Sequence, residues 1–422
     1  MAVHITGVAV ALDWMADLLE TEGANPFRIG AYPRAGAAIE NKLDNVGGMI
    51  ADGRPLDELP GISENLVGKI EEIVRTAKMK PLDEVETRYV ARFRDRRREA
   101  FSHLLSLICL VGLSLLWTTF GRADDITVRV GYFPNITHAQ ALVARNFERR
   151  GRDWFAPWLG ARVKLEWYAY NAGPSAMEAI FAESLDLSYV GPNPAINAYA
   201  RSGGEEIRIL AGAVEGGSAL VVRPDLILTK PADFRGKRIG TPQFGNTQDV
   251  AARAWLIAGG LRITQAGGDA QVLPTANPDQ LALFKTRQLD AVWTVEPWVS
   301  RLELEAGGKV LVEQKDAVTT LLVSRAGFLA QHRDIVSRFV NAHRELTTWI
   351  NQHPDEAQRM IGDELKADFR IVMSAELFAR AWMRMSLTSS ISSSQLQAFV
   401  TSAQQVGFLH SMPDLSRLVD PQ

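Results

Sequence analysis

Cysteine is nearly absent from this sequence, since Cys109 is the only one among 422 residues. No disulfide can therefore form within one chain, and a metal site built from clustered cysteines is excluded. A surplus of positive charge is missing too, because 46 lysines and arginines face 49 aspartates and glutamates, which leaves a net charge of −3. The chain as a whole therefore lacks the net positive charge that is typical of nucleic-acid-binding proteins. There is also no internal repeat and no low-complexity tract.

The common catalytic motifs are absent as well. The sequence has no phosphate-binding P-loop and no His-Glu-x-x-His zinc motif. Gly216 and Ser218 resemble the start of a serine nucleophile elbow, but Leu220 stands where that motif needs its second glycine. We therefore expect a protein that is not an enzyme and that holds no cofactor and no metal.

One long apolar run is present, at residues 104–117, and it follows a cluster of arginines at 92–98. A charged segment, an apolar run and small residues before a cut, here Gly121 and Ala123, form the pattern of a secretory signal. The arginines predict that preceding residues stay in the cytoplasm and that the following domain is exported to the periplasm. Cleavage after Ala123 would release a soluble protein, whereas an uncleaved segment at 101–120 is long enough to anchor it in the inner membrane. The alternative to a signal or an anchor is that this apolar run forms a helix buried inside a globular domain.

This run divides the chain into three predicted parts. Residues 1–86 form a small helical domain, 87–123 a basic linker with the signal-like or transmembrane segment, and 124–422 a larger globular domain. The sequence leaves open whether the first part is a natural fusion or reflects a start codon placed too early, with Met79 as the later start.

The sequence LPGIS at 59–63 predicts a tight Pro-Gly turn between two helices. Such a turn exposes backbone amides that can hold a DNA phosphate, and a lysine in the following helix adds positive charge. Gly61, Ser63 and Lys69 are therefore candidate contacts to DNA phosphate.

The N-terminal part resembles the N-terminal helical domain of bacterial family X DNA polymerases. The motifs that carry the resemblance are LLE at 18–20, EGANPFR at 22–28, AY at 31–32 and LPGI at 59–62. The resemblance implies an all-α helix-hairpin-helix domain. It implies no polymerase activity, because no palm with carboxylates for two metals follows. Two alternatives stay open: a helical domain without DNA affinity, or one that binds DNA weakly and without sequence preference.

Residues 124–422 alternate between strand and helix patterns. The run ITVRVGY at 126–132 predicts a strand, and a polar loop joins it to a helix that begins near His138. This alternation is typical of an α/β fold with mostly parallel sheets. Further strands are predicted at 163–169, 187–190, 207–214, 219–223, 238–241, 271–273, 291–294 and 318–324. The alternation restarts after two consecutive strands, so we expect two lobes, with the last of these strands returning to the first lobe and only helices after it.

Four predicted helices begin with a polar side chain: Thr137, Ser175, Asn193 and Thr247. The free amides and the dipole of a helix N-terminus attract anions. In open α/β sheets such loops gather at the carboxyl ends of the strands, where ligands bind. The sequence therefore predicts a cleft for an anionic ligand between the lobes.

Five motifs make residues 124–422 resemble the substrate-binding proteins of ABC importers for aliphatic sulfonates, taurine and nitrate. They are GYFPNITHA at 131–139, NAGPSAMEA at 171–179, DLSYVGPNPA at 186–195, GNTQDV at 245–250 and EPW at 296–298. The resemblance implies a two-lobed periplasmic binding protein of type II that closes on its ligand like a hinge. An ABC permease is then the expected partner. The ligand stays open between sulfonate, taurine, nitrate and an uncharged heterocycle such as a thiamine precursor.

The helix starts and the resemblance together predict a set of ligand-binding residues. They are Asn135, Thr137, His138, Ser175, Gly191, Pro192, Asn193, Gly217, Ser218, Asn246, Thr247, Gln248, Glu296 and Trp298. Three carry alternatives: His138 contacts the ligand or only packs, Glu296 contacts a ligand amine or fixes a loop, and Trp298 walls the cleft or fills a core. The alternative function is a DNA-associated protein whose larger domain senses a small molecule.

Overall fold

The computed structural model describes residue 67 and residues 125–264, 267–409 and 411–421. The chain divides into two compact units, and the second, Arg122–Gln422, contains all of these ranges except residue 67. The predicted hairpin contacts Gly61, Ser63 and Lys69 and the signal-like segment lie outside the described residues. Within the described residues, no helix is long and apolar enough to cross a bilayer.

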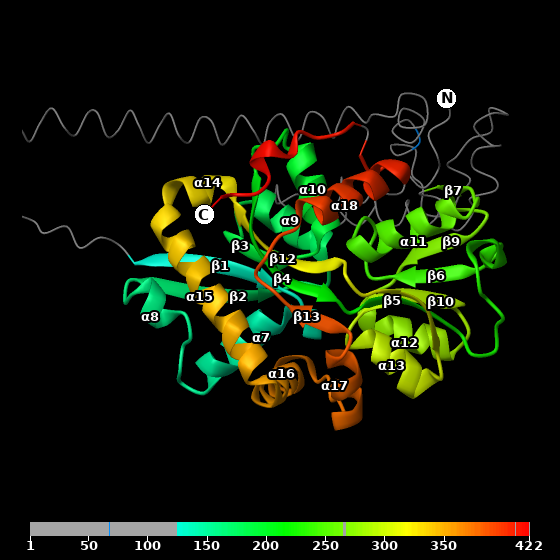
Figure 1. Ribbon diagram of the computed structural model, residues 1–422, viewed down its shortest axis with the longest axis horizontal. Coiled ribbons are helices and arrows are strands. Elements are labelled where there is room, and N and C mark those ends of the chain that lie inside the picture. The colour runs from blue at the N-terminus through cyan, green and yellow to red at the C-terminus, as the bar shows by residue number, and fades with distance from the viewer. Residues whose placement is uncertain (1–66, 68–124, 265–266, 410, 422) are drawn as a thin grey trace, which may run out of the picture. The chain divides into compact units, whose positions relative to one another are not determined.

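The first lobe is built on a six-stranded sheet (Figure 1). β1 pairs in parallel with β2 and β3, whereas β12 runs antiparallel between β3 and β4. In spatial order the strands are β13 (Met385–Leu387), β4 (Ile207–Gly216), β12 (Val318–Arg325), β3 (Leu187–Val190), β1 (Ile126–Tyr132) and β2 (Val163–Ala169). The predicted return of the chain to this lobe through β12 is confirmed. The expectation that only helices follow it is wrong, because β13 adds an edge strand beside β4.

The second lobe is built on a five-stranded sheet. β6 pairs in parallel with β9 and β10, and β5 runs antiparallel to β10 and β11. In spatial order the strands are β11 (Lys309–Gln314), β5 (Ser218–Val222), β10 (Ala291–Val295), β6 (Arg238–Thr241) and β9 (Gln271–Pro274). A separate hairpin joins β7 (Ile263–Thr264) and β8 (Gly267–Gly268). The predicted α/β architecture with two lobes is thus confirmed.

Helices cover both faces of each sheet, so alternate side chains of the buried strands enter different cores. In β3, Leu187 and Tyr189 join one core and Val190 the other. The first lobe carries η2 (Ile136–His138), α7 (Ala139–Arg149), α8 (Ala156–Leu159), α9 (Gly173–Phe181), α10 (Pro192–Arg201), α14 (Ala326–Gln331), α15 (Arg333–Gln352), α16 (Pro354–Phe369), α17 (Ala375–Trp382), α18 (Ser393–Gln405) and η4 (Leu415–Arg417). The second lobe carries η3 (Pro231–Phe234), α11 (Thr247–Ala258), α12 (Asn277–Lys285) and α13 (Trp298–Ala306).

The chain crosses between the lobes twice, from β4 to β5 and from β11 to β12. At the first crossing Gly216 and Gly217 have φ angles of 74° and 71°, which favour glycine. A Cβ on Gly216 would also lie 2.2 Å from the carbonyl oxygen of Arg384. The segment after β12 bridges the lobes as well, because α17 packs on α13 and α18 packs on α11 (Figure 1).

A buried histidine in the first lobe predicts a loss of stability in acid. His343 of α15 is 0% exposed and contacts the Tyr189 hydroxyl at 3.0 Å and the Gly212 carbonyl oxygen at 2.8 Å. Burial lowers its pKa to about 4, whereas in the unfolded chain we expect about 6.5. Since the unfolded chain then takes up this proton first, stability should fall by about 3 kcal/mol as the pH drops from about 6.5 towards 4.

His343→Gln should flatten this part of the pH dependence, because glutamine can replace the hydrogen bonds but does not titrate. Urea unfolding of both proteins between pH 7 and pH 4 measures the difference. His353→Gln is the matched control, since the His353 side chain is exposed. An equal slope for wild type and His343→Gln would contradict the prediction.

Candidate functional site

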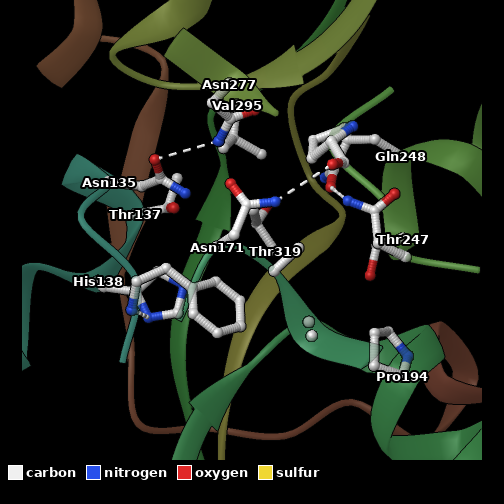
Figure 2. Close-up of a pocket in the computed structure, with 16 residues that line it drawn as sticks. Asn135, Thr137, His138, Asn171, Pro194, Thr247, Gln248, Asn277, Val295 and Thr319 are labelled. Carbon is white, nitrogen blue, oxygen red and sulfur yellow. Dashed lines mark hydrogen bonds between the residues drawn. The ribbon is translucent and has the colours of Figure 1, made fainter. Parts of the chain in front are cut away.

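A small cavity lies where the two lobes meet (Figure 2). Its volume is about 30 Å³, room for roughly two water molecules. Loops after β1, β2 and β3 line it from the first lobe, and loops after β6 and β9 from the second. These are the carboxyl ends of parallel strands, where the sequence predicted a cleft. The lining residues are Phe133, Asn135, Thr137, His138, Asn171, Ala172, Gly173, Gly191, Pro194, Pro242, Asn246, Thr247, Gln248, Asn277, Val295 and Thr319.

Three helices of nine or more residues begin in the cavity wall: α9 at Gly173, α11 at Thr247 and α12 at Asn277. Their first amides and their dipoles favour negative charge at this point. The Asn246 side chain accepts a hydrogen bond from the Asp249 amide at 2.8 Å and so caps α11. The wall therefore presents the positive ends of helices from both lobes.

Two threonine hydroxyls in the wall have no hydrogen-bond partner within the described part of the chain. Thr137 of the first lobe is 1% exposed and Thr247 of the second is 4% exposed, and the Oγ1 atom of each is buried and unpaired. Leaving a buried hydroxyl unpaired costs about 1–3 kcal/mol. Because each hydroxyl can donate, the pair offers a ligand one hydrogen bond from each lobe.

The lobes are in contact around the cavity. Asn135 Oδ1 accepts hydrogen bonds from Asn277 Nδ2 at 3.3 Å and from Trp298 Nε1 at 2.9 Å. Asn171 Nδ2 donates to the Pro242 carbonyl oxygen at 3.3 Å. These three bonds run from the first lobe to the second and hold the cleft closed.

His138 enters the wall as an uncharged ring. Its Nδ1 accepts a hydrogen bond from the Phe133 amide at 3.3 Å, and the centres of the two rings are 4.3 Å apart. Burial lowers the His138 pKa to about 3. The imidazole is therefore neutral at ordinary pH, with its proton on Nε2. It packs against Phe133, and it lines the cavity (Figure 2).

Seven of the predicted ligand-binding residues line this cavity: Asn135, Thr137, His138, Gly191, Asn246, Thr247 and Gln248. The other seven are not among the lining residues: Ser175, Pro192, Asn193, Gly217, Ser218, Glu296 and Trp298. Several of the latter hold the wall in place, as their contacts show.

The side chains of Ser175, Ser218 and Asn193 donate to neighbouring polar groups. Ser175 Oγ donates to the Ala172 carbonyl oxygen at 2.9 Å, beside the start of α9. Ser218 Oγ donates to Gln314 Oε1 at 2.8 Å and accepts from the lining residue Gln248 at 3.4 Å. Asn193 Nδ2 donates to the carbonyl oxygen of Phe399 in α18 at 3.2 Å, so it fastens α10 to α18.

Glu296 is hydrogen-bonded to other residues of the protein, Ser300 and Arg384. Its carboxylate is 0% exposed and accepts hydrogen bonds from the Ser300 amide and hydroxyl and from Arg384 Nη1 at 3.0 Å. Burial raises the pKa of this carboxyl, and Ser300 and Arg384 oppose the shift. Of the two alternatives for Glu296, these contacts favour fixing a loop. Trp298, 3% exposed, likewise orients Asn135 through its indole N–H.

Two side-chain amides in the wall, Asn171 and Asn277, were not among the predicted ligand-binding residues. Asn277 is the first residue of α12 and donates across the cleft. The polar helix start that identified Thr137 and Thr247 is present at Asn277 too. Among the described residues, no cluster of His, Cys, Asp or Glu is arranged to hold a metal.

A model of the NMT1-like family matches residues 121–362, which is more than half of the chain. The chain belongs to the NMT1-like family. A helix-hairpin-helix domain model matches residues 7–79, which confirms the hairpin reading of the N-terminal part. The likeness to family X polymerases remains a prediction.

Relatives of this family member are named as binding proteins. A Brucella abortus (strain 2308) protein named as a binding protein is 25% identical over 330 residues, which cover 76% of this chain and 92% of the relative. A Bacillus subtilis (strain 168) protein named as an aliphatic sulfonates-binding protein is 25% identical over 216 residues, half of this chain and 63% of the relative. These matches confirm the predicted likeness to substrate-binding proteins of ABC importers.

Solved structures share the fold. The alkanesulfonate-binding protein SsuA from Xanthomonas axonopodis pv. citri, bound to MOPS, gives a TM-score of 0.54 at 20% identity and covers 67% of this chain and 92% of its own. The periplasmic nitrate-binding protein NrtA from Synechocystis PCC 6803 gives 0.58 at 16% identity, with coverage of 68% and 83%. The family member therefore has the fold of periplasmic binding proteins.

Proposed function

We propose that this protein is the solute-binding component of an ABC importer. It captures an aliphatic sulfonate or a similar small anion between its lobes and delivers it to a permease in the inner membrane. The observation that carries the proposal is the pair of unpaired, buried hydroxyls of Thr137 and Thr247, one on each lobe, beside the N-termini of α9, α11 and α12. An anion that accepts from both hydroxyls would stabilise the closed cleft.

The ligand contacts proposed for this function are the predicted residues that line the cavity, with Asn171 and Asn277 added. Ser175, Asn193, Ser218, Glu296 and Trp298 then support the wall through their hydrogen bonds. Replacing Asn193 should accordingly act through the contact between α10 and α18.

Thr247→Val should weaken ligand binding about 10- to 100-fold, because hydrogen bonds to charged groups contribute about 1.5–3 kcal/mol. Valine keeps the shape of threonine and removes only the donor. Isothermal titration with short alkanesulfonates and nitrate measures the change. Thr348→Val on α15 is the matched control, since its hydroxyl donates to the Arg344 carbonyl oxygen at 3.1 Å and its side chain is exposed. Equal affinities for Thr247→Val and wild type would refute the role, and absence of binding to every anion would refute the function.

The proposed location is the periplasm, with the protein either cleaved after Ala123 or anchored by residues 101–120. An alkaline phosphatase fusion after Gly131 should then be active and a fusion at Glu86 inactive, because the enzyme folds only outside the cytoplasm and arginine-rich flanks stay inside. The reverse pattern would overturn the proposed topology.

A second candidate function is association with DNA through the N-terminal domain, which the helix-hairpin-helix match at 7–79 favours. Gly61, Ser63 and Lys69 would contact phosphates, so binding would be weak, independent of sequence and strongly dependent on salt.

A further inference from the structure

Among the residues that the structure describes, none in the cavity wall carries an ionised side chain. None of the lining residues is an aspartate, glutamate, lysine or arginine, and the one histidine is neutral because burial lowers its pKa to about 3. Polar recognition therefore depends on amides, hydroxyls and helix N-termini. A ligand that carries both a positive and a negative group meets no carboxylate in this wall.

Two buried carboxylates next to the lining residues are already paired. Asp249 follows Gln248 and accepts from Arg253 Nε, the Gly245 amide and Thr241 Oγ1, each at 3.0 Å. Glu296 follows Val295 and is paired with Arg384 at 3.0 Å. Both carboxylates are 0% exposed, so neither is available to a ligand ammonium group.

The dipoles in the wall act against a cation. The N-termini of α9, α11 and α12 place partial positive charge there. An ammonium group buried without a counter-charge loses hydration that nothing replaces, and this loss weakens its binding. The unpaired hydroxyls of Thr137 and Thr247 can donate to a sulfonate or nitrate oxygen.

We infer that the cleft selects anions that carry no ammonium group, so that it binds simple alkanesulfonates and rejects aminosulfonates such as taurine. This inference rests on the proposed function. The absence of a carboxylate from the wall decides it, because the two ligand classes share the sulfonate and differ in the cation.

Isosteric ligand pairs test the inference on the purified full-length protein. Propanesulfonate and taurine differ by a methyl against an ammonium group, and ethanesulfonate and aminomethanesulfonate form the same pair one carbon shorter. Calorimetry should show the alkanesulfonate of each pair bound at least 100-fold more tightly. Equal affinity within the pairs would overturn the inference and leave the proposed function intact. Binding of nitrate alone would also overturn the inference, because the size of the anion would then determine the selectivity. Binding of no anion would refute the proposed function itself.

A gain of affinity provides the second test. Val295 lines the cavity at the end of β10 and is 5% exposed. Val295→Asp supplies the missing carboxylate, so the ratio of taurine to propanesulfonate affinity should rise at least tenfold. Val295→Asn, similar in shape but uncharged, should leave the ratio as in wild type. A rise in both variants, or in neither while both are folded by circular dichroism, contradicts the inference. If Val295→Asp does not fold, the ligand pairs on the wild type decide.

Discussion

Replacing Arg384 with methionine should lower the free energy of unfolding by about 3–5 kcal/mol, the usual cost of leaving a buried charge without its partner. The Arg384 side chain is 14% exposed and lies just before β13 of the first lobe. Its guanidinium donates to Glu296 at 3.0 Å and to Glu303 at 2.7 Å, both in the second lobe. Methionine keeps the apolar stem but leaves the buried Glu296 unpaired.

The same arginine holds the first crossing between the lobes. Its carbonyl oxygen accepts from the Gly217 amide at 2.8 Å, so the side chain and the backbone of one residue fix both lobes near the hinge. Chemical unfolding followed by circular dichroism measures the loss. Arg380→Met is the matched control, because Arg380 is 39% exposed, lies 3.7 Å from Glu303 and should cost less than about 1 kcal/mol.

A double variant separates loss of charge pairing from loss of packing. Glu296→Gln combined with Arg384→Met removes the unpaired charge, so the double variant should be more stable than Arg384→Met alone. If the double variant loses the sum of the two single losses, Arg384 and Glu296 are not coupled and the explanation fails.

Gly191→Val should weaken ligand binding by 100-fold or more, because it prevents the lobes from closing. A Cβ on Gly191 would lie 2.4 Å from Thr247 Oγ1 across the cleft. The threonine is β-branched and its hydroxyl is buried, so it has little freedom to move aside. The Gly191 backbone, with φ −69° and ψ 155°, accepts any side chain, so the fold itself should be retained.

Calorimetry with an alkanesulfonate measures the affinity, and small-angle scattering with and without ligand reports closure. Gly191→Ala should give a smaller loss in the same direction. Gly327→Ala is the control, since its added Cβ meets only the end of the Arg325 side chain, at 3.0 Å. A Gly191→Val protein that binds and closes like wild type would show that the approach of these two residues does not limit closure.

The strands were predictable because their signals are local. β1, β2, β3 and β6 occupy the residues that were predicted as strands. β13 was not predictable, because Met385–Leu387 is only three residues long and owes its conformation to pairing with β4. A short segment of this kind carries no period of its own, and only its neighbour determines it.

The candidate site was partly predictable for the same reason. Thr137 lies just before α7 and Thr247 begins α11, as their polar side chains predicted. The predicted starts at Ser175 and Asn193 are wrong, because α9 and α10 already begin at Gly173 and Pro192. Glu296 and Trp298 form a conspicuous motif, yet their side chains turn to Arg384 and Asn135, which are distant in the sequence. A motif identifies the residues of a region but not the direction in which each side chain points.

By itself, the sequence determined the two-lobed α/β architecture, the likeness to substrate-binding proteins and the start of α11 at Thr247, since each depends on patterns within a few residues. The tertiary structure decided that Asn277 and Trp298 meet Asn135, that Gly191 faces Thr247 and that Arg384 takes the charge of Glu296. Each of those contacts joins residues from both lobes or from either side of the hinge. Only the closed arrangement of two sheets brings them within a few ångströms, and no local pattern encodes that distance.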